Sequence, residues 1–169
     1  MAFRPKVVLD AIDWRILDEL QEDARLSHAE LARRVHLSPP AVAARIRRLE
    51  DAGVVRGYRV ELGLPALGVD VLAFVQVRSQ PAGRRAFADV VEAMREVLEC
   101  HHVTGQDCYV VKVAAGSMRH LEEIVTELGR HGATTTSIVF SSVVGRRTLR
   151  RPDDEQRGEA GAGPAGRRG

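Results

Sequence analysis

The N-terminal part of the sequence contains two short helical segments that only two residues separate, and this spacing limits the possible fold most. The first segment begins at Ser27, and Glu30 stands three residues later, which is the spacing of a capping box. The second begins at Ser38, the expected cap, with Pro39 in the first helical position, where a missing N–H leaves no hydrogen bond unmade. A tight turn between two short helices is typical of a helix-turn-helix.

A further helix precedes this pair. Residues 10–23 repeat apolar side chains on one helical face, and Asp10 is a candidate N-cap. The helix that begins at Ser38 runs to about Gly53 and has a narrow apolar stripe. The stripe is formed by Val42, Ile46 and Leu49. Because each helix has one apolar face, the sequence predicts a small three-helix bundle.

Positive charge gathers on the outer face of the last helix. Between residues 31 and 49 there are five arginines and no acidic residue, whereas the whole chain has a formal net charge of only +2. With the apolar stripe turned inward, the residues expected to point outward are Pro40, Ala41, Ala44, Arg45, Arg47 and Arg48. Such a basic face can simply be solvated, but the capped three-helix context favours contact with DNA.

The expected DNA contacts follow from the geometry of a helix-turn-helix. Its second helix enters the major groove, so the N-terminal residues of that helix meet base edges and later arginines meet phosphates. Double-stranded DNA is therefore the expected partner. The predicted DNA-binding residues are Ser27, Ser38, Pro39, Ala41, Ala44, Arg45, Arg47 and Arg48.

Beyond these helices the pattern of the chain changes. The stretch VVRGYRVEL is strand-like, and the turn-forming residues GLPALG that follow mark a boundary. We expect a helix-turn-helix domain at 1–62, a linker at 63–68 and a second domain at 69–150. The tail at 151–169 is expected to be disordered, because it has no large apolar residue with which to offset the entropy of ordering.

The second domain repeats the order strand, helix, strand. The predicted strands are 69–78, 97–104, 109–114 and 136–144, and the predicted helices are 84–94 and the segment that Ser117 caps. Two βαβ halves joined by a short turn predict a ferredoxin-like βαββαβ sheet with both helices on one face. The expected fold class is therefore α+β, with an N-terminal winged helix-turn-helix and a C-terminal βαββαβ module.

The second face of this sheet needs either a polar surface or a partner. The strand sequences LAFVQV and YVVKV are apolar on both alternating sets of positions. The pattern therefore predicts a homodimer formed through the sheet face. Such a dimer would also present two DNA-reading helices.

Other kinds of chemistry have little support in the sequence. Zinc prefers thiolate and imidazole ligands such as Cys100, His101, His102 and Cys108, but strand alternation would point His101 away from its two neighbours, and no CxxC or HxxxH pair is present. The two cysteines are too few for a disulfide framework. The chain also lacks a nucleophile elbow, a phosphate-binding glycine loop and a paired general acid and base, so neither a metal site nor an enzyme is expected.

The location of the protein is also predicted from apolar patterning. The chain has no run of about 18 apolar residues, and its N-terminus breaks into a helical pattern before a signal-type stretch could form. A cytoplasmic protein without a membrane partner is expected.

Three stretches resemble the Lrp/AsnC family of transcription regulators. They are LDAIDWRILDELQEDARLSHAELARRVHLSP, RIRRLEDAGVVRGY and LECHHVTGQDCYVVKV, and the resemblance runs from about Leu9 to about Arg150. It implies an N-terminal helix-turn-helix and a C-terminal module that dimerises and often forms octamers. It further implies that an amino acid or related effector binds between modules, with no other cofactor.

The resemblance also implies positions for the effector site. In the family the turn usually reads Gly-x-x-Asp-Tyr; here Cys108 stands at the usual aspartate position and Asp107 precedes it. The implied effector-binding residues are Thr104, Gly105, Gln106, Asp107, Cys108, Tyr109, Thr134 and Thr136. Taken by itself, a glycine-containing turn is often an ordinary hairpin. The alternative function is thus an architectural DNA-binding protein without a small-molecule effector.

Overall fold

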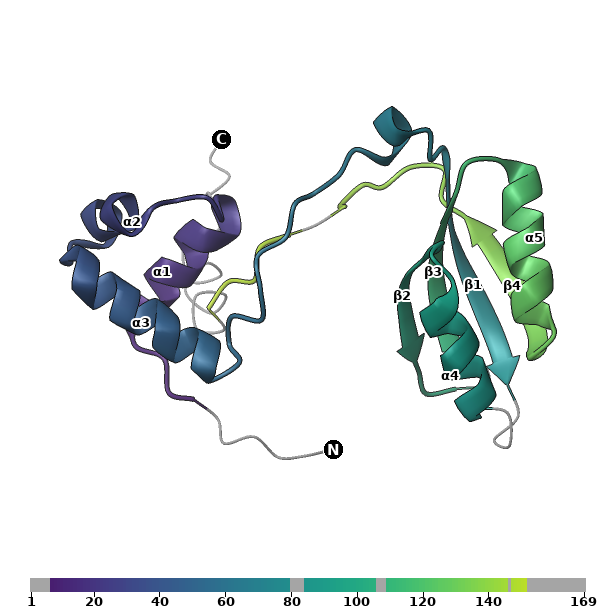
Figure 1. Cartoon of the computed structure of the whole chain (residues 1–169), viewed down its shortest axis with the longest axis horizontal. Helices are drawn as coiled ribbons and strands as arrows, with labels where there is room; N and C mark the ends of the chain where they lie inside the picture. Colours follow the sequence, from purple (N-terminus) through teal and green to yellow (C-terminus); the bar gives the residue numbers. More distant parts are fainter. Residues whose placement is uncertain (1–6, 80–83, 106–108, 146, 152–169) are drawn as a thin grey trace, which may run out of the picture. The chain divides into compact units, whose positions relative to one another are not determined.

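The computed structural model describes residues 7–79, 84–105, 109–145 and 147–151 (Figure 1). Contacts group these residues into two compact units. The first unit comprises the described residues up to Val60 together with those from Val144 onward, and the second is Glu61–Val143. The predicted domain boundaries stay a prediction.

The first unit contains three helices, as predicted: α1 at Ala11–Glu22, α2 at His28–Val35 and α3 at Pro39–Asp51. Capping boxes begin both α1, at Asp10, and α2, at Ser27, which confirms the two predicted caps. The predicted apolar faces meet in one core. Its buried residues are Ile16, Leu31, Ala32, Val35, Val42, Ile46 and Leu49.

The cap of α3 differs from the prediction. Ser38 has the extended backbone of an N-cap, but its side chain makes no capping hydrogen bond. An N-cap hydroxyl accepts from the N–H of the second or third helical residue. Here Pro40 occupies the second position and has no N–H, so only the N–H of the third residue, Ala41, could donate to the Ser38 hydroxyl. The fixed φ of the two prolines starts this helix instead.

The predicted strand over 54–62 is wrong, because these residues form no strand. The N–H groups of Val54 and Val55 both donate to the carbonyl of Leu49, at 2.9 and 3.1 Å, and so close the end of α3. A strand needs a neighbouring backbone to pair with, and among the described residues the only paired strands are the four of the sheet β2-β3-β1-β4, which does not include 56–62. The turn formers that follow make a short 3₁₀ helix, η1, at Leu64–Leu67.

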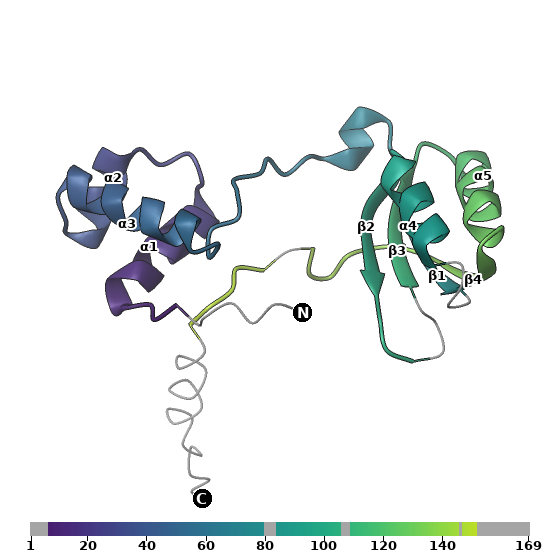
Figure 2. The same ribbon diagram turned by 60° about the horizontal axis from the view of Figure 1, so that its bottom comes forward.

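The second unit is the expected βαββαβ module. Its elements are β1 (Val71–Ser79), α4 (Arg84–Ala93), β2 (Val97–His102), β3 (Tyr109–Ala115), α5 (Met118–Gly129) and β4 (Gly132–Ile138). The strands pair antiparallel in the order β2-β3-β1-β4. Both helices cover the same face of the sheet (Figures 1 and 2). The ferredoxin-like prediction is therefore confirmed.

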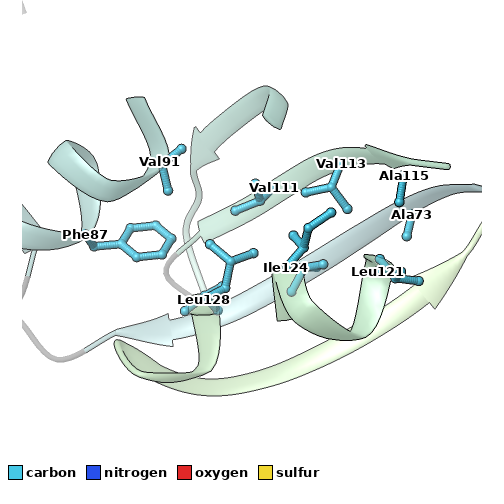
Figure 3. Packing of buried hydrophobic residues seen from close by; sticks show 11 residues of the cluster. Ala73, Phe87, Val91, Val111, Val113, Ala115, Leu121, Ile124 and Leu128 are labelled. Carbon is cyan, nitrogen blue, oxygen red and sulfur yellow. The ribbon is translucent and has the colours of Figure 1, made fainter. Parts of the chain in front are cut away.

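The core of the second unit lies between the helices and that face. Phe87 and Val91 of α4 and three residues of α5 point toward the strands (Figure 3). The three α5 residues are Leu121, Ile124 and Leu128. Every second residue of β1 and β3 completes this core, as a strand period of two requires.

The last strand begins and ends earlier than predicted. The apolar run after residue 136 suggested a strand to 144, whereas β4 spans Gly132–Ile138. Its register explains the difference, because Ile138 pairs with Ala73, close to the start of β1. Residues beyond 140 would therefore extend past the beginning of β1 and have no partner there.

The open face of the sheet mixes apolar and charged groups. One row across it contains Glu99, Lys112, Phe74 and Ser137. The Lys112 Nζ donates to Glu99 Oε1 at 2.9 Å, and Phe74 beside them is 39% exposed. The face is thus less apolar than the two strand sequences suggested, and dimerisation through it stays a prediction.

Two substitutions in α5 compare the loss of a buried side chain with the loss of an exposed one. Leu128→Ala removes a fully buried side chain and should lower the free energy of unfolding by about 2 to 5 kcal/mol. Met118→Ala, at a side chain that is 56% exposed, should change it by less than about 0.5 kcal/mol. Denaturant unfolding followed by far-ultraviolet circular dichroism measures both. Equal losses for the two variants would contradict the packing described.

A matched serine pair tests the two caps. Ser27→Ala removes an oxygen that accepts from the Glu30 N–H at 3.2 Å and should destabilise the first unit by about 1 kcal/mol. Ser38→Ala removes no capping bond and should cost less than about 0.5 kcal/mol. The sequence has one tryptophan, Trp14 on α1, so its fluorescence during unfolding reports this unit. A larger loss for Ser38→Ala would show that its hydroxyl does cap α3.

Candidate nucleic-acid interface and effector turn

A buried carboxylate joins α1 to α3 in the first unit. Asp13 has no exposed surface, and its Oδ2 accepts from the Asp10 N–H at 3.0 Å as part of the capping box. Arg45 Nη1 donates to Asp13 Oδ1 at 2.7 Å, and Arg48 Nη2 donates to Asp13 Oδ2 at 2.5 Å. The two guanidinium groups therefore neutralise a charge that would otherwise be buried without a partner.

Arg45 bridges two carboxylates at once. Its Nη1 also donates to Asp10 Oδ2 at 2.7 Å. The Asp13 N–H, and then Arg45, hold the pKa of Asp10 below its ordinary value. Hydrogen bonds to Asp10 and Asp13 in turn raise the pKa of Arg45, so this guanidinium stays charged.

These contacts correct part of the prediction that all three arginines of α3 point outward, because two of them bind α1. The Arg45 side chain is only 27% exposed and that of Arg48 is 49% exposed, and both are bound to Asp13. The sequence contained a signal for this pairing. Asp13 lies on the apolar face of its helix, because Ile16, Leu17 and Leu20 follow it at i+3, i+4 and i+7. An acidic residue therefore occupies a position where the pattern predicts an apolar one.

The other arginines of the basic run divide in the same way. Arg34 Nη1 donates to Glu19 Oε2 on α1 at 2.6 Å. Arg33 and Arg47 are exposed and make no hydrogen bond or ion pair with any residue that the structure describes. The charge of the run is therefore partly met by α1, and two guanidinium groups remain for other partners.

Arg47 lies at a shallow hollow of about 320 Å³ on the first unit. The hollow is lined by Leu20, Ala24, Leu26, His28, Ala43, Ile46, Arg47, Glu50 and Tyr58. On its rim the Tyr58 hydroxyl donates to Glu50 Oε1 at 3.0 Å. The pKa of Tyr58 is raised, mainly by burial and to a lesser extent by the hydrogen bond to this carboxylate. A charged guanidinium near the start of α2 can meet an anionic group such as a phosphate.

The front of α3 is exposed and carries small side chains. Ser38, Pro39 and Ala44 are exposed, and Ala41 is half-buried. Ser27 is exposed at the start of α2. The bend between the two helices is made by His36, a non-glycine residue with φ 57°. Small residues on an exposed helix start leave room for another surface to approach closely.

The candidate effector residues fall at one end of the second unit. Thr104 and Gly105 are exposed in the turn after β2, and Gly105 has φ 114°. Gln106, Asp107 and Cys108 lie outside the described residues. Backbone pairing places His102, Tyr109, Val77 and Thr134 in one row across all four strands.

The pairing of the strands determines which of the candidate residues lie close together. Tyr109 on β3 and Thr134 on β4 are separated by β1 alone, which corresponds to about 10 Å between their backbones. Thr136 lies two rows further from that end, opposite Val75, and a separation of two residues puts it on the same side of the sheet. Both threonines therefore share the helix-covered side of β4, the edge strand.

An aromatic cluster that the sequence did not suggest lies at the same end. The ring of Tyr109 is 4.6 Å from that of Phe87 and 5.0 Å from that of His102, between centroids. His131 meets Phe87 edge-on at 5.8 Å. The four rings come from four different segments, so only the pairing of the strands and the packing of α4 bring them together.

The residues considered for zinc have other neighbours. Burial raises the pKa of the Cys100 thiol, and His101 Nε2 lies 3.3 Å from Glu99 Oε2. Cys108 is outside the described part of the chain. Among the residues that are described, no three His, Cys, Asp or Glu side chains converge to hold a metal ion.

Within the described ranges, no helix combines the length and the apolar character needed to span a bilayer.

Comparison with known proteins gives both units a family context. Residues 9–56 match the family model of the winged helix-turn-helix DNA-binding domain, and residues 72–149 match that of the Lrp/AsnC ligand binding domain. The HTH-type transcriptional regulator LrpC of Bacillus subtilis (strain 168) is 33% identical over 135 residues, which are 80% of this chain and 94% of that protein. The leucine-responsive regulatory protein of Escherichia coli (strain K12) is 38% identical over 147 residues, with 83% and 90% covered.

Solved structures agree with these relatives. The crystal structure of a Neisseria meningitidis transcriptional regulator in complex with L-Met has a TM-score of 0.79 at 34% identity, covering 84% of this chain and 96% of that one. The structure of Bacillus subtilis LrpC has a TM-score of 0.79 at 31% identity, covering 83% and 100%. A helix-turn-helix unit, a βαββαβ unit and relatives that match across both units lead to one conclusion: the chain belongs to the Lrp/AsnC family of transcription regulators.

Proposed function

We propose that this chain is a sequence-specific DNA-binding transcription regulator whose activity responds to an amino acid or a related small molecule. The observation that carries the proposal is the exposed front of α3, with small side chains at its start and the Arg47 guanidinium, which pairs with none of the described residues. A helix of this form fits the major groove with its first residues near base edges. Relatives with both units are transcription regulators by name.

The exposed residues divide into two roles on the duplex. Ser38, Pro39, Ala41 and Ala44 are close enough to the start of α3 to approach base edges and thymine methyl groups. Ser27 and Arg47 reach the phosphate backbone, where they position the helix without reading sequence. Arg48 is half exposed, so it contributes to the duplex only with the nitrogens that Asp13 does not hold.

A dimer is the functional unit in this proposal. One helix-turn-helix makes few phosphate contacts, and non-specific affinity at physiological salt is typically only ~10⁻⁴ to 10⁻⁶ M. Two copies on half-sites about 34 to 36 Å apart supply the missing contacts. The open face of the sheet, which includes Leu72 and Phe74 of β1, is the proposed contact. A homodimer, or a higher assembly such as an octamer, forms in the cytoplasm.

The effector site is proposed at the end of the sheet that carries the turn after β2. Its residues are Thr104, Gly105, Gln106, Asp107, Cys108, Tyr109, Thr134 and Thr136. Backbone N–H groups at a glycine turn suit a ligand carboxylate, and Asp107 or the hydroxyls suit an ammonium group. A solved relative was crystallised with L-Met, which is a ligand of this chemistry.

The effector acts through its differential affinity for two arrangements of the subunits. Coupling of this kind is typically worth about 1 to 3 kcal/mol. A second candidate function omits this step, and the cysteine at position 108, where the family usually has aspartate, favours it. Calorimetric titration of the dialysed protein with each of the twenty amino acids separates the two. Absence of heat for all of them would leave the architectural DNA binder.

Arg47→Ala tests the phosphate contact. If Arg47 meets one phosphate, the variant should bind DNA more weakly at all sequences, and the slope of log affinity against log salt should fall by about 0.9. Arg119→Ala is the control, because Arg119 is an exposed arginine of α5 in the second unit. Affinity and slope equal to those of the unmodified chain in the Arg47→Ala variant would remove this assignment.

Gly105→Arg tests the effector turn. A side chain at φ 114° strains the turn, and the arginine adds bulk where the ligand is proposed to bind, so the response of DNA affinity to amino acids should be lost. DNA binding without effector should persist, because Gly105 lies in the second unit. Gly145→Arg adds the same side chain in open space and should keep the response. A full response in the Gly105→Arg variant would place the site elsewhere.

A further inference from the structure

Asp13 is a charged residue on the buried side of α1, where apolar residues are expected. Of the residues that the structure describes, only Asp13 buries an ionisable side chain completely. A buried carboxylate is tolerated when donors meet its charge, and Asp13 has three, namely the Asp10 N–H and the guanidinium groups of Arg45 and Arg48. Two of these donors belong to α3.

The two arginines define the rotation of α3 about its own axis. Residues three apart on a helix lie about 60° from each other around the axis and about 4.5 Å apart along it, so one carboxylate can hold both. Arg47 lies roughly 160° and 100° around the helix from Arg45 and Arg48. Fixing the pair against α1 therefore turns Arg47 away from α1, whereas Ala44, about 40° around the helix from Arg48, stays on the side of Arg48.

The apolar contacts alone constrain this rotation weakly. The stripe of α3 consists of three buried residues, Val42, Ile46 and Leu49, and a narrow stripe tolerates rotation of the helix by sliding of side chains. Charge-assisted hydrogen bonds are directional and short. The Asp13 contacts thus add an orientation that the small core does not supply.

We infer that Asp13 is a positioning residue for DNA reading, which sets the rotation of α3 through Arg45 and Arg48 and so determines which side chains face the bases. This inference rests on the proposed function of DNA binding. Arg45 acts within the protein and is not a DNA contact, while Arg48 is shared between Asp13 and the outside. Asp13 itself touches no nucleic acid, and its effect appears as sequence discrimination.

Neutralising Asp13 has two opposite consequences under this inference. Loss of the carboxylate lets α3 rotate, which weakens contacts that require a defined orientation toward base edges. It also releases the Arg48 guanidinium from the protein and leaves Arg45 bound to Asp10 alone, so positive charge that was held can reach phosphates. Specific binding should therefore weaken while non-specific binding strengthens, a pattern that simple destabilisation of the fold does not produce.

The test is Asp13→Asn in the full chain, with two duplex probes. One is a duplex selected by the unmodified protein from a randomised pool, and the other has the same bases in shuffled order. The ratio of the two affinities should fall about tenfold or more in Asp13→Asn, since lost base contacts are worth that much. The salt slope on the shuffled duplex should steepen by up to about 0.9 for each released arginine that gains a phosphate.

The control is Glu22→Gln, which changes an exposed carboxylate of the same helix and the net charge by the same amount. It should keep the affinity ratio of the unmodified chain. Trp14 fluorescence during unfolding verifies that each variant is folded at the assay temperature. A folded Asp13→Asn variant with an unchanged ratio would overturn the inference.

A second pair of variants decides the matter if Asp13→Asn does not fold. Arg45→Lys keeps a cation that can donate to Asp13, and Arg45→Met keeps the length without the charge. The affinity ratio should be retained by Arg45→Lys and lost by Arg45→Met, whereas equal ratios would overturn the positioning role. If the unmodified chain selects no duplex from the pool, the proposed function fails, and this outcome differs from failure of the Asp13 inference.

Discussion

Asp13 of α1 is completely buried against α3, and its negative charge must be balanced by hydrogen bonds within the first unit. The Asp10 N–H, Arg45 and Arg48 supply the hydrogen bonds. Because the core of this unit is small, breaking a buried ion pair of this kind, which typically costs about 3 to 5 kcal/mol, would affect a large part of its stability. The same contacts decide how much positive charge α3 presents outward.

The second unit depends on a different constraint, the register of four antiparallel strands. One row of pairing joins β2, β3, β1 and β4 at the end of the sheet where the turn after β2 lies. This row brings Tyr109 within two strands of Thr134, although they are far apart in the sequence. It also gathers the rings around Phe87, so the proposed ligand end rests on a packed aromatic layer.

Much of this architecture could be predicted from local patterns. The caps at Asp10 and Ser27 and the apolar spacing of α4 and α5 each depend on residues close in the chain, and the structure has them where the sequence indicated. Errors arose where the outcome depends on a distant partner. The expected strand at 54–62 pairs with none of the described strands, and the position of β4 is set by its pairing with β1 rather than by its own apolar run.

The amino-acid sequence alone determined the helices of the first unit, the repeated βαβ order of the second and the small front of α3. These features follow from hydrogen bonds and side-chain spacing within a few residues, which the order of amino acids specifies directly. Only the tertiary structure decided which arginines remain unpaired. Arg45, Arg47 and Arg48 are chemically alike in the sequence, and the buried carboxylate of Asp13, some thirty residues earlier, binds two of them because packing of α1 on α3 places it there.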